Sequence, residues 1–383
     1  MDLSVTTVSV AQTTTQPPLP DVCNEVDTDF LAERFWLCVV VGLTVSAISV
    51  VENVFIFVLF LTSRQHRNSY NLYLMLLSFF DVFMGISYIL LMSVAVLVNY
   101  TASYTLKMMW ATYMVPMLAI SHLAMTTSSF LITFAAVERY AITVAHRSVE
   151  LLQANRRILV VIAFAIALIT KGSMFYEVTI TLNHNCTGGV QEFQTVPGPL
   201  LQYEWFRNYF RFYFRTITTI FAPFFILLYL NFRLVARLIQ PSREKNGQML
   251  DVQHVKQKKA RIFAATRSLV TLVGTYLLSN LLSVFVSFWE YVDIVSLYSN
   301  YISFYVLSVD AVSLLTIVSC ALRLPIYVTF QPLFRKEAGQ FLGRLCGCKR
   351  GKLLRNGSML ERDAYSATQT LIATPPAEQQ VAV

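Results

Sequence analysis

Polar and ionisable side chains interrupt several long apolar stretches of this sequence. Asn53 lies within VENVFIFVLF, and Asp81 lies within LMLLSFFDVFMG. An ionisable group buried in the apolar interior of a membrane costs free energy, so each one is a candidate for function. Buried together, the two could share a hydrogen-bond network or bind an ion. The alternative is that Asn53 joins two helices by hydrogen bonding and Asp81 makes a structural polar contact.

Glu138, Arg139 and Tyr140 form a second group, at the end of another apolar stretch. Adjacent opposite charges at a membrane boundary can pair while they are desolvated, and they can separate when a partner or a proton intervenes. The tripeptide alone indicates little. Its place at the end of the third of seven apolar segments makes a conformational switch the favoured interpretation.

The remaining patterns argue against catalysis. The sequence has no GxSxG and no HExxH motif, and no His or further Cys accompanies Cys346 and Cys348 at a metal-ligand spacing. We therefore expect neither an enzyme, nor a bound metal, nor a cofactor.

Composition indicates where these residues must lie. Of the 383 residues, 55% are hydrophobic and only 14% are charged, about half the charged share of a soluble domain. The excess of apolar residues must meet lipid, because a soluble protein covers its surface with polar groups. The net charge of +8 could suggest nucleic acid, but in so apolar a chain it fits a cytoplasmic membrane face better.

A bilayer core requires about 20 apolar residues per helix. Seven segments meet this requirement and predict an all-α membrane protein, a seven-helix bundle: about 36–62, 71–98, 108–143, 157–182, 205–239, 262–289 and 299–328. There is no internal repeat of the kind that transporters display.

Lys and Arg predict the orientation of the bundle. Most of them follow the first, third, fifth and seventh segments, whereas the N-terminal tail is acidic. We therefore expect an extracellular tail over residues 1–35, a membrane domain over 36–328, and a cytoplasmic part over 329–383. Within the last part, Phe334–Leu345 alternates apolar and basic residues, which predicts a short amphipathic helix on the membrane surface.

These landmarks together resemble a rhodopsin-like (class A) G-protein-coupled receptor, and the resemblance covers all seven segments. It is carried by Asn53, Asp81, Glu138-Arg139-Tyr140, Pro223 and Pro325. The stretches MFYEV, PFFILLYLNFRLV, TYLLSN and LRLPIYV further resemble nematode FMRFamide-like neuropeptide receptors. The resemblance assigns Glu138, Arg139, Tyr140, Pro325 and Tyr327 to activation and G-protein coupling.

Two departures from the family pattern affect these assignments. The sixth segment has no proline, which puts a kink there in doubt. In the seventh, Tyr327 comes one residue early and could face elsewhere, and Arg323 adds a charge that could pair with Asp81 or face the cytoplasmic cavity.

Family members usually join the third helix to the second outer loop by a disulfide. The loop cysteine is present as Cys186, but the usual partner position is Met114. Because the outside is oxidising, we expect Cys186 to pair with Cys23. Cys38 is the second candidate, and free thiols or a dimer link remain open.

Three further residues are candidates for modification. Asn185 begins an Asn-Cys-Thr glycosylation sequon on the same outer loop as Cys186. Cys346 and Cys348 lie among basic residues after the surface helix, which suits palmitoylation; the alternative is two unmodified cytosolic thiols.

The resemblance also directs attention to a ligand pocket. Ser121 replaces the acid of amine receptors, and the seventh segment has no lysine for retinal. The outer half has a mixed charged mouth instead, in which a carboxylate could bind the Arg of an amidated peptide and aromatic side chains could hold its ring. Its candidate residues are His122, Glu177, Arg211, Arg215, Glu290, Tyr305 and Asp310.

Some of these candidates could instead have purely structural roles. The arginines at positions 207, 211 and 215 recur every four residues along one helix face, and they could simply pair with Glu204 or extend to lipid headgroups. His122 could be an internally satisfied histidine of the bundle.

The expected function is therefore a plasma-membrane receptor for an amidated FMRFamide-like neuropeptide, acting on a heterotrimeric G protein. The resemblance implies arrestin as a partner, and the terminal Val381-Ala382-Val383 could bind a PDZ domain. The alternatives are an orphan receptor with a non-peptide ligand or without G-protein coupling and, last, a membrane transporter.

Overall fold

The computed structural model describes residues 23, 30–62, 71–144, 147, 149–239, 252–293 and 300–345 of the chain. Seven helical segments among them are long and apolar enough to cross a membrane, which confirms the predicted seven-helix architecture. We number them spans one to seven: Leu31–Thr62, Asn71–Thr101, Tyr104–Val144, Arg156–Tyr176, Phe206–Ile239, Ile262–Val292 and Ile302–Phe330.

Several spans contain more than one type of helix, and short π-helical turns widen spans one, two and five. Span one contains α1 (Leu31–Arg34), η2 (Phe35–Val41) and α2 (Gly42–Thr62), and span two contains α4 (Asn71–Tyr88), η3 (Ile89–Ser93) and α5 (Val94–Thr101). Span three is α6 (Tyr104–Val144), which is followed by the short α7 (Val149–Ala154), and span four contains α8 (Arg156–Lys171) and η4 (Gly172–Tyr176). Span five contains η8 (Phe206–Arg215), η9 (Ile217–Phe221) and α9 (Ala222–Ile239), span six lies in α10 (Val252–Val292), and span seven contains α12 (Ile302–Ala321) and α13 (Arg323–Phe330).

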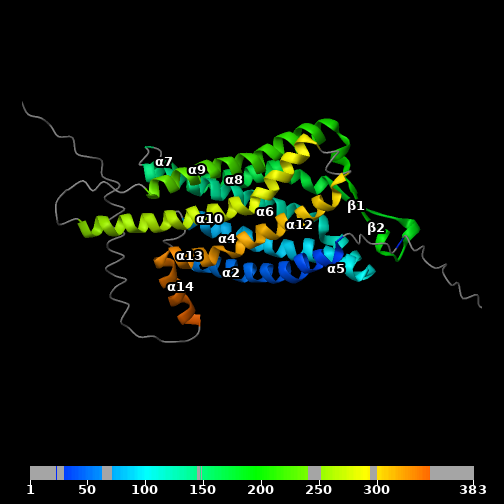
Figure 1. Cartoon of the computed structure of the whole chain (residues 1–383), viewed down its shortest axis with the longest axis horizontal. Helices are drawn as coiled ribbons and strands as arrows, with labels where there is room; N and C mark the ends of the chain where they lie inside the picture. Colours follow the sequence, from blue (N-terminus) through cyan, green and yellow to red (C-terminus); the bar gives the residue numbers. More distant parts are fainter. Residues whose placement is uncertain are drawn as a thin grey trace, which may run out of the picture. The chain divides into compact units, whose positions relative to one another are not determined.

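The spans form a closed ring of contacts that includes α6. Helix α2 packs on α4, α4 on α6, and α6 on both α8 and α9, while α9 meets α10, α10 meets α12, and α12 returns to α2. Figure 1 shows the long helices side by side, with a β-hairpin at one end of the bundle. We call this the hairpin end, and the opposite end, where Arg139 lies, the Arg139 end.

The predicted end of the fourth segment at residue 182 is wrong. Its helical part stops at Tyr176, and β1 (Val178–Leu182) pairs antiparallel with β2 (Phe193–Pro197). The run Val-Thr-Ile-Thr is β-branched, which favours a strand over another turn of helix. Hydropathy alone did not distinguish this strand from membrane-spanning helix.

Gly198 fixes the junction between this hairpin and span four. Its N–H donates to the Glu177 carbonyl at 2.8 Å. A Cβ at this position would lie 2.3 Å from the Tyr176 carbonyl oxygen, so the two backbones meet at a distance that only glycine permits. Glu177 is thereby held at the hairpin end of span four.

The positions of proline explain the continuity of span six and the change of helix in span seven. Without a proline, α10 remains one continuous α-helix. Span seven changes helix at Leu322, and Pro325 lies in the first turn of α13, where a missing N–H leaves no intrahelical bond unmade.

The chain divides into two units, Met1–Pro332 and Leu333–Val383. The second contains nearly all of α14 (Pro332–Leu345), a helix at the position predicted for the surface helix. The candidate palmitoylation sites Cys346 and Cys348 lie outside the described residues.

Candidate functional site

Asp81 and Arg323 form an ion pair in the interior of the bundle. The two side chains are 0% and 4% exposed. Of the two positions that the sequence left open for Arg323, the structure has the pairing with Asp81. Each charge thus neutralises the other where lipid and packed side chains provide no solvation.

Asn53 lies beside this pair and connects spans one and seven. Its side-chain amide donates to the carbonyl oxygens of Ser49 at 2.9 Å and of Cys320 at 3.2 Å. In spans three and six, the hydroxyls of Ser129 and Tyr276 are 2.7 Å apart. Buried polar bonds therefore join five of the seven spans.

Glu138 is bound by Arg156 of span four. The guanidinium Nε lies 3.1 and 3.0 Å from the two carboxylate oxygens, and Nη2 lies 2.5 Å from Oε1. Glu138 thus has a partner in span four that the sequence did not suggest.

The remaining activation residues lie around the same end. The Tyr140 hydroxyl accepts a hydrogen bond from Arg233 of span five at 3.3 Å. Tyr327 is 1% exposed, whereas Pro325 is on the surface. Although Tyr327 comes one residue early in its motif, it faces the interior.

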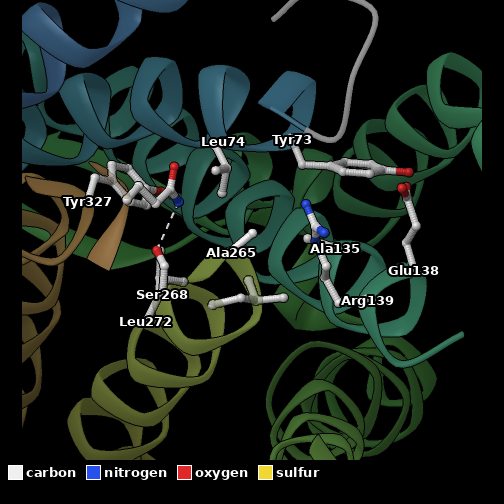
Figure 2. A pocket seen from close by; sticks show the side chains of 11 residues that line it. Tyr73, Leu74, Ala135, Glu138, Arg139, Ala265, Ser268, Leu272 and Tyr327 are labelled. Carbon is white, nitrogen blue, oxygen red and sulfur yellow. Dashed lines mark hydrogen bonds between the residues drawn. The ribbon is translucent and has the colours of Figure 1, made fainter. Parts of the chain in front are cut away.

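A narrow cavity of about 10 Å³ lies at the Arg139 end, enough for about one water molecule. Figure 2 shows Tyr327 and Arg139 on its wall and the Tyr73 hydroxyl pointing toward the Glu138 carboxylate. The Ser268 hydroxyl accepts a hydrogen bond from the Gln331 amide at 2.9 Å across spans six and seven. The lining residues are Tyr73, Leu74, Ala135, Glu138, Arg139, Ala265, Ser268, Leu269, Leu272, Tyr327 and Gln331.

This cavity is closed to any large partner. An α-helix with its side chains is about 10–12 Å across, so a helix could enter only if the walls separated. The walls belong to spans two, three, six and seven. Opening therefore means moving whole spans relative to one another.

At the hairpin end, Glu177 is surrounded by donors. Arg215 donates to both carboxylate oxygens, at 2.5 and 3.0 Å, and the Ser173 hydroxyl donates to Oε1 at 2.7 Å. Burial alone would raise the pKa of Glu177, but the hydrogen bonds and charge of Arg215 together hold it below its ordinary value. Glu177 is thus a paired carboxylate.

Asp310 is paired as well, with Arg34 at the start of span one, at 2.7 Å. Its side chain is 2% exposed. Two of the three acids expected at the mouth of the bundle, Glu177 and Asp310, are therefore bonded to arginines of this chain. Glu290 and Tyr305 are half-buried at the same end.

Two arginines of the expected stripe, Arg211 and Arg215, lie on the same side of span five, because both reach the Glu177 carboxylate. Arg215 is buried, whereas Arg211 is 46% exposed and Arg207 lies on the surface. The segment that contains them is π-helical, with i to i+5 hydrogen bonding.

Cys23 and Cys186 form a disulfide with a Cα–Cα distance of 5.2 Å, the pairing that the sequence favoured over Cys38. Cys38 is a buried free thiol. Asn185, beside the disulfide, is exposed on the hairpin loop.

Three important residues are absent from the sequence-based site: Lys171, Arg156 and Arg34. The last two were counted only as charges that set the orientation. Lys171 is 8% exposed and lies within span four. Because Lys171 is an ionisable group within an apolar span, the same cost of burial that marks Asp81 marks Lys171 as a candidate for function.

Comparison with known families agrees with this geometry. Residues 52–322, more than two-thirds of the chain, match the family model described as "7 transmembrane receptor (rhodopsin family)". The search of curated proteins finds no matching relative. The match covers Asp81, the Glu138-Arg139-Tyr140 group and Glu177, and it ends one residue before Arg323. This chain therefore belongs to the rhodopsin family of seven-transmembrane receptors and is a receptor rather than an enzyme.

Proposed function

We propose that this receptor couples an extracellular amidated neuropeptide of the FMRFamide-like class to an intracellular heterotrimeric G protein. The observation that carries the proposal is the closed cavity at the Arg139 end, whose walls come from four spans. A ligand that favours an arrangement with separated walls would open a site for a helix of the G protein α-subunit.

The hairpin end is the extracellular side in this proposal, in the plasma membrane. The Cys23–Cys186 disulfide requires an oxidising compartment, and the Asn185 sequon is exposed beside it. The excess of Lys and Arg after the odd-numbered spans supports a cytoplasmic Arg139 end. Residues 36–328 are then the membrane domain, residues 1–35 lie outside, and residues 329–383 lie inside.

Span six is the element that we expect to move. Because α10 has no proline, a displacement at its hairpin end is transmitted along one rigid helix to the cavity. Its contacts there include the Ser268–Gln331 hydrogen bond. Breaking a few such contacts costs little, so a ligand could shift the equilibrium.

Aromatic side chains support a peptide with aromatic residues as the ligand. Phe212 of span five stacks on Tyr291 of span six at a centroid distance of 5.4 Å. Trp289 meets Tyr301 at 5.4 Å. A peptide ring inserted between these elements would gain aromatic contacts and press on span six. The subclass rests on the resemblance of MFYEV, PFFILLYLNFRLV, TYLLSN and LRLPIYV to the FMRFamide-like receptors.

The C-terminal region completes the proposal. Palmitoyl groups on Cys346 and Cys348 would add a second membrane anchor after α14. Arrestin and a PDZ protein are the further partners that we propose for the tail. All of these sites lie outside the described residues.

The decisive experiment measures nucleotide exchange by purified G proteins on receptor-containing membranes with a panel of amidated peptides. We expect one peptide class to stimulate exchange at least ten-fold. Arg139→Ala should abolish stimulation while keeping peptide binding, and Arg207→Ala, an exposed change at the opposite end, should leave it intact. Peptide binding without exchange in wild type would contradict coupling, and no response to any peptide would contradict the ligand class.

A further inference from the structure

Three cationic side chains surround one carboxylate at the hairpin end, and two of them are paired with it. Lys171 ends α8, Arg211 and Arg215 lie in η8, and Glu177 follows span four. The charge of Lys171 lies within electrostatic range of all three others. We call these four residues the Lys171 cluster. It has an excess of positive charge in a position where water is scarce.

Glu177 has no capacity left to balance that excess. Its Oε1 accepts from Arg215 at 2.5 Å and from Ser173 at 2.7 Å. Its Oε2 accepts from Arg215 at 3.0 Å, and the Arg211 Nε lies 3.6 Å away. The carboxylate is therefore committed to the arginines and the serine.

Lys171 is the cation without an acceptor. It is 8% exposed, and in the part of the chain that the structure describes it has neither a hydrogen bond nor an ion pair. His122 of span three lies close to Lys171 and Arg215, and its Nδ1 is buried without a hydrogen-bond partner among the same residues. A buried ammonium group needs a counter-charge or strong acceptors.

We propose that the Lys171 cluster is an anion site that binds a carboxylate of the ligand. Lys171 donates to that carboxylate, and Arg211, the half-exposed member, donates from the rim of the site. This deepens the proposed function and rests on it: the peptide's anchoring charge is an acidic side chain, the reverse of the arginine that the sequence suggested. A free small carboxylate would have the same chemistry, so the experiment has one arm for each source.

The first arm needs no known agonist. The melting temperature of the full-length receptor, purified in detergent, is measured with sodium glutarate and with neutral glutaramide at constant ionic strength. Glutarate should raise the melting temperature by about 3 °C in wild type, and glutaramide should not. Lys171→Gln should lose the shift and Lys171→Arg should retain it.

Two further variants keep this arm decisive. Arg211→Gln, at a half-exposed position, should fold normally and reduce the shift even if Lys171→Gln does not fold. Lys107→Gln is the matched control, because Lys107 lies at the hairpin end but over the ring of Trp110 instead of in the cluster. It should leave the shift unchanged. The anion site is overturned if glutarate does not shift the melting temperature of wild type, or if Arg211→Gln and Lys171→Gln both show a shift as large as that of wild type.

The second arm uses the amidated peptides of the exchange assay, each made with its Asp or Glu and again with Asn or Gln. In wild type the amide version should be at least ten-fold less potent, and in Lys171→Gln the two versions should differ less than two-fold. If replacement of the acid by its amide lowers potency equally in wild type and in Lys171→Gln, the carboxylate at this site is not a side chain of the peptide.

The two arms separate failure of this site from failure of the proposed function. If glutarate raises the melting temperature but no peptide is active, the anion site is retained with a small carboxylate as its ligand, and the peptide is rejected as the ligand. If peptides are active but glutarate gives no shift and potency does not depend on the peptide's acid, the protein remains a peptide receptor and the anion site is rejected.

Discussion

Arg323 and Asp81 each solve the other's solvation problem. Either charge alone, buried among apolar side chains, would lack compensation, whereas the pair is neutral. A pair of this kind contributes less to stability than its Coulomb energy suggests, because both partners were desolvated to form it. Removal of one partner is the costly event.

Arg323→Gln should therefore destabilise the receptor by about 3–5 kcal/mol, because it leaves Asp81 buried without its counter-charge. Asp81→Asn combined with Arg323→Gln should recover most of that loss, since no charge remains. Melting temperature and the yield of folded protein measure both effects. Additive losses in the double variant would show that the two side chains are not coupled.

Glu177 gives a prediction about pH. Its pKa is held below the ordinary value of 4.5, so its pairing stabilises the receptor at pH values above 4.5. That contribution is lost as the pH falls through the lowered pKa. Wild type should melt higher than Glu177→Gln at pH 7 and at pH 5, and the two should converge below pH 4.5. A difference that stayed constant down to the lowest pH would contradict an ionised Glu177.

Single residues were only partly predictable from the sequence. Asp81 and Arg323 could be paired because both are charges in apolar segments and few such charges exist. The bond between Glu138 and Arg156 could not be predicted, because the two residues lie 18 positions apart on different helices. Lys171 could be identified as a charge within an apolar segment, but its role could not, because that depends on which donors already occupy Glu177.

At the scale of elements, apolar length identified all seven spans, whereas their ends and irregularities needed the folded chain. The strand at Val178–Leu182 is apolar enough to extend span four, and only its pairing with β2 separates the two. The π-helical turns of span five likewise have no sequence signal that we could identify.

The hairpin and the N-terminal tail form one element through Cys23 and Cys186, which are 163 residues apart. Removal of this crosslink frees a long loop in the unfolded chain and should cost about 2–5 kcal/mol. Cys23→Ala, Cys186→Ala and the double variant should therefore melt at the same lowered temperature. If either single variant matched wild type, or mass mapping of the oxidised protein found both thiols free, the crosslink would be excluded.

At the scale of the whole molecule, activation requires span six to separate from its neighbours at the Arg139 end. The cavity now has room for about one water molecule, so a helix can enter only after an increase in width comparable to its own radius. Such a movement has a direct measure in the distance between spans.

Spin labels at Ile158 in span four and Phe263 in span six report this distance, since both side chains are exposed. With Cys346 and Cys348 replaced by Ser, an activating peptide should lengthen the distance by about 5 Å, half a helix diameter. Labels at Phe175 and Phe288, exposed near the hairpin end, are the matched control and should move less. An unchanged distance between Ile158 and Phe263 with an activating peptide bound would exclude displacement of span six.

Arg323 carries one further consequence. A lone carboxylate in the middle of such a bundle could recruit a cation from solution, and the resting state would then vary with the salt around the cell. Here the cation is covalently part of the chain and is always present at one per site. The affinity of the resting receptor for its ligand should therefore be the same in sodium as in choline, so that the receptor responds to its messenger independently of the ionic composition of the surrounding fluid.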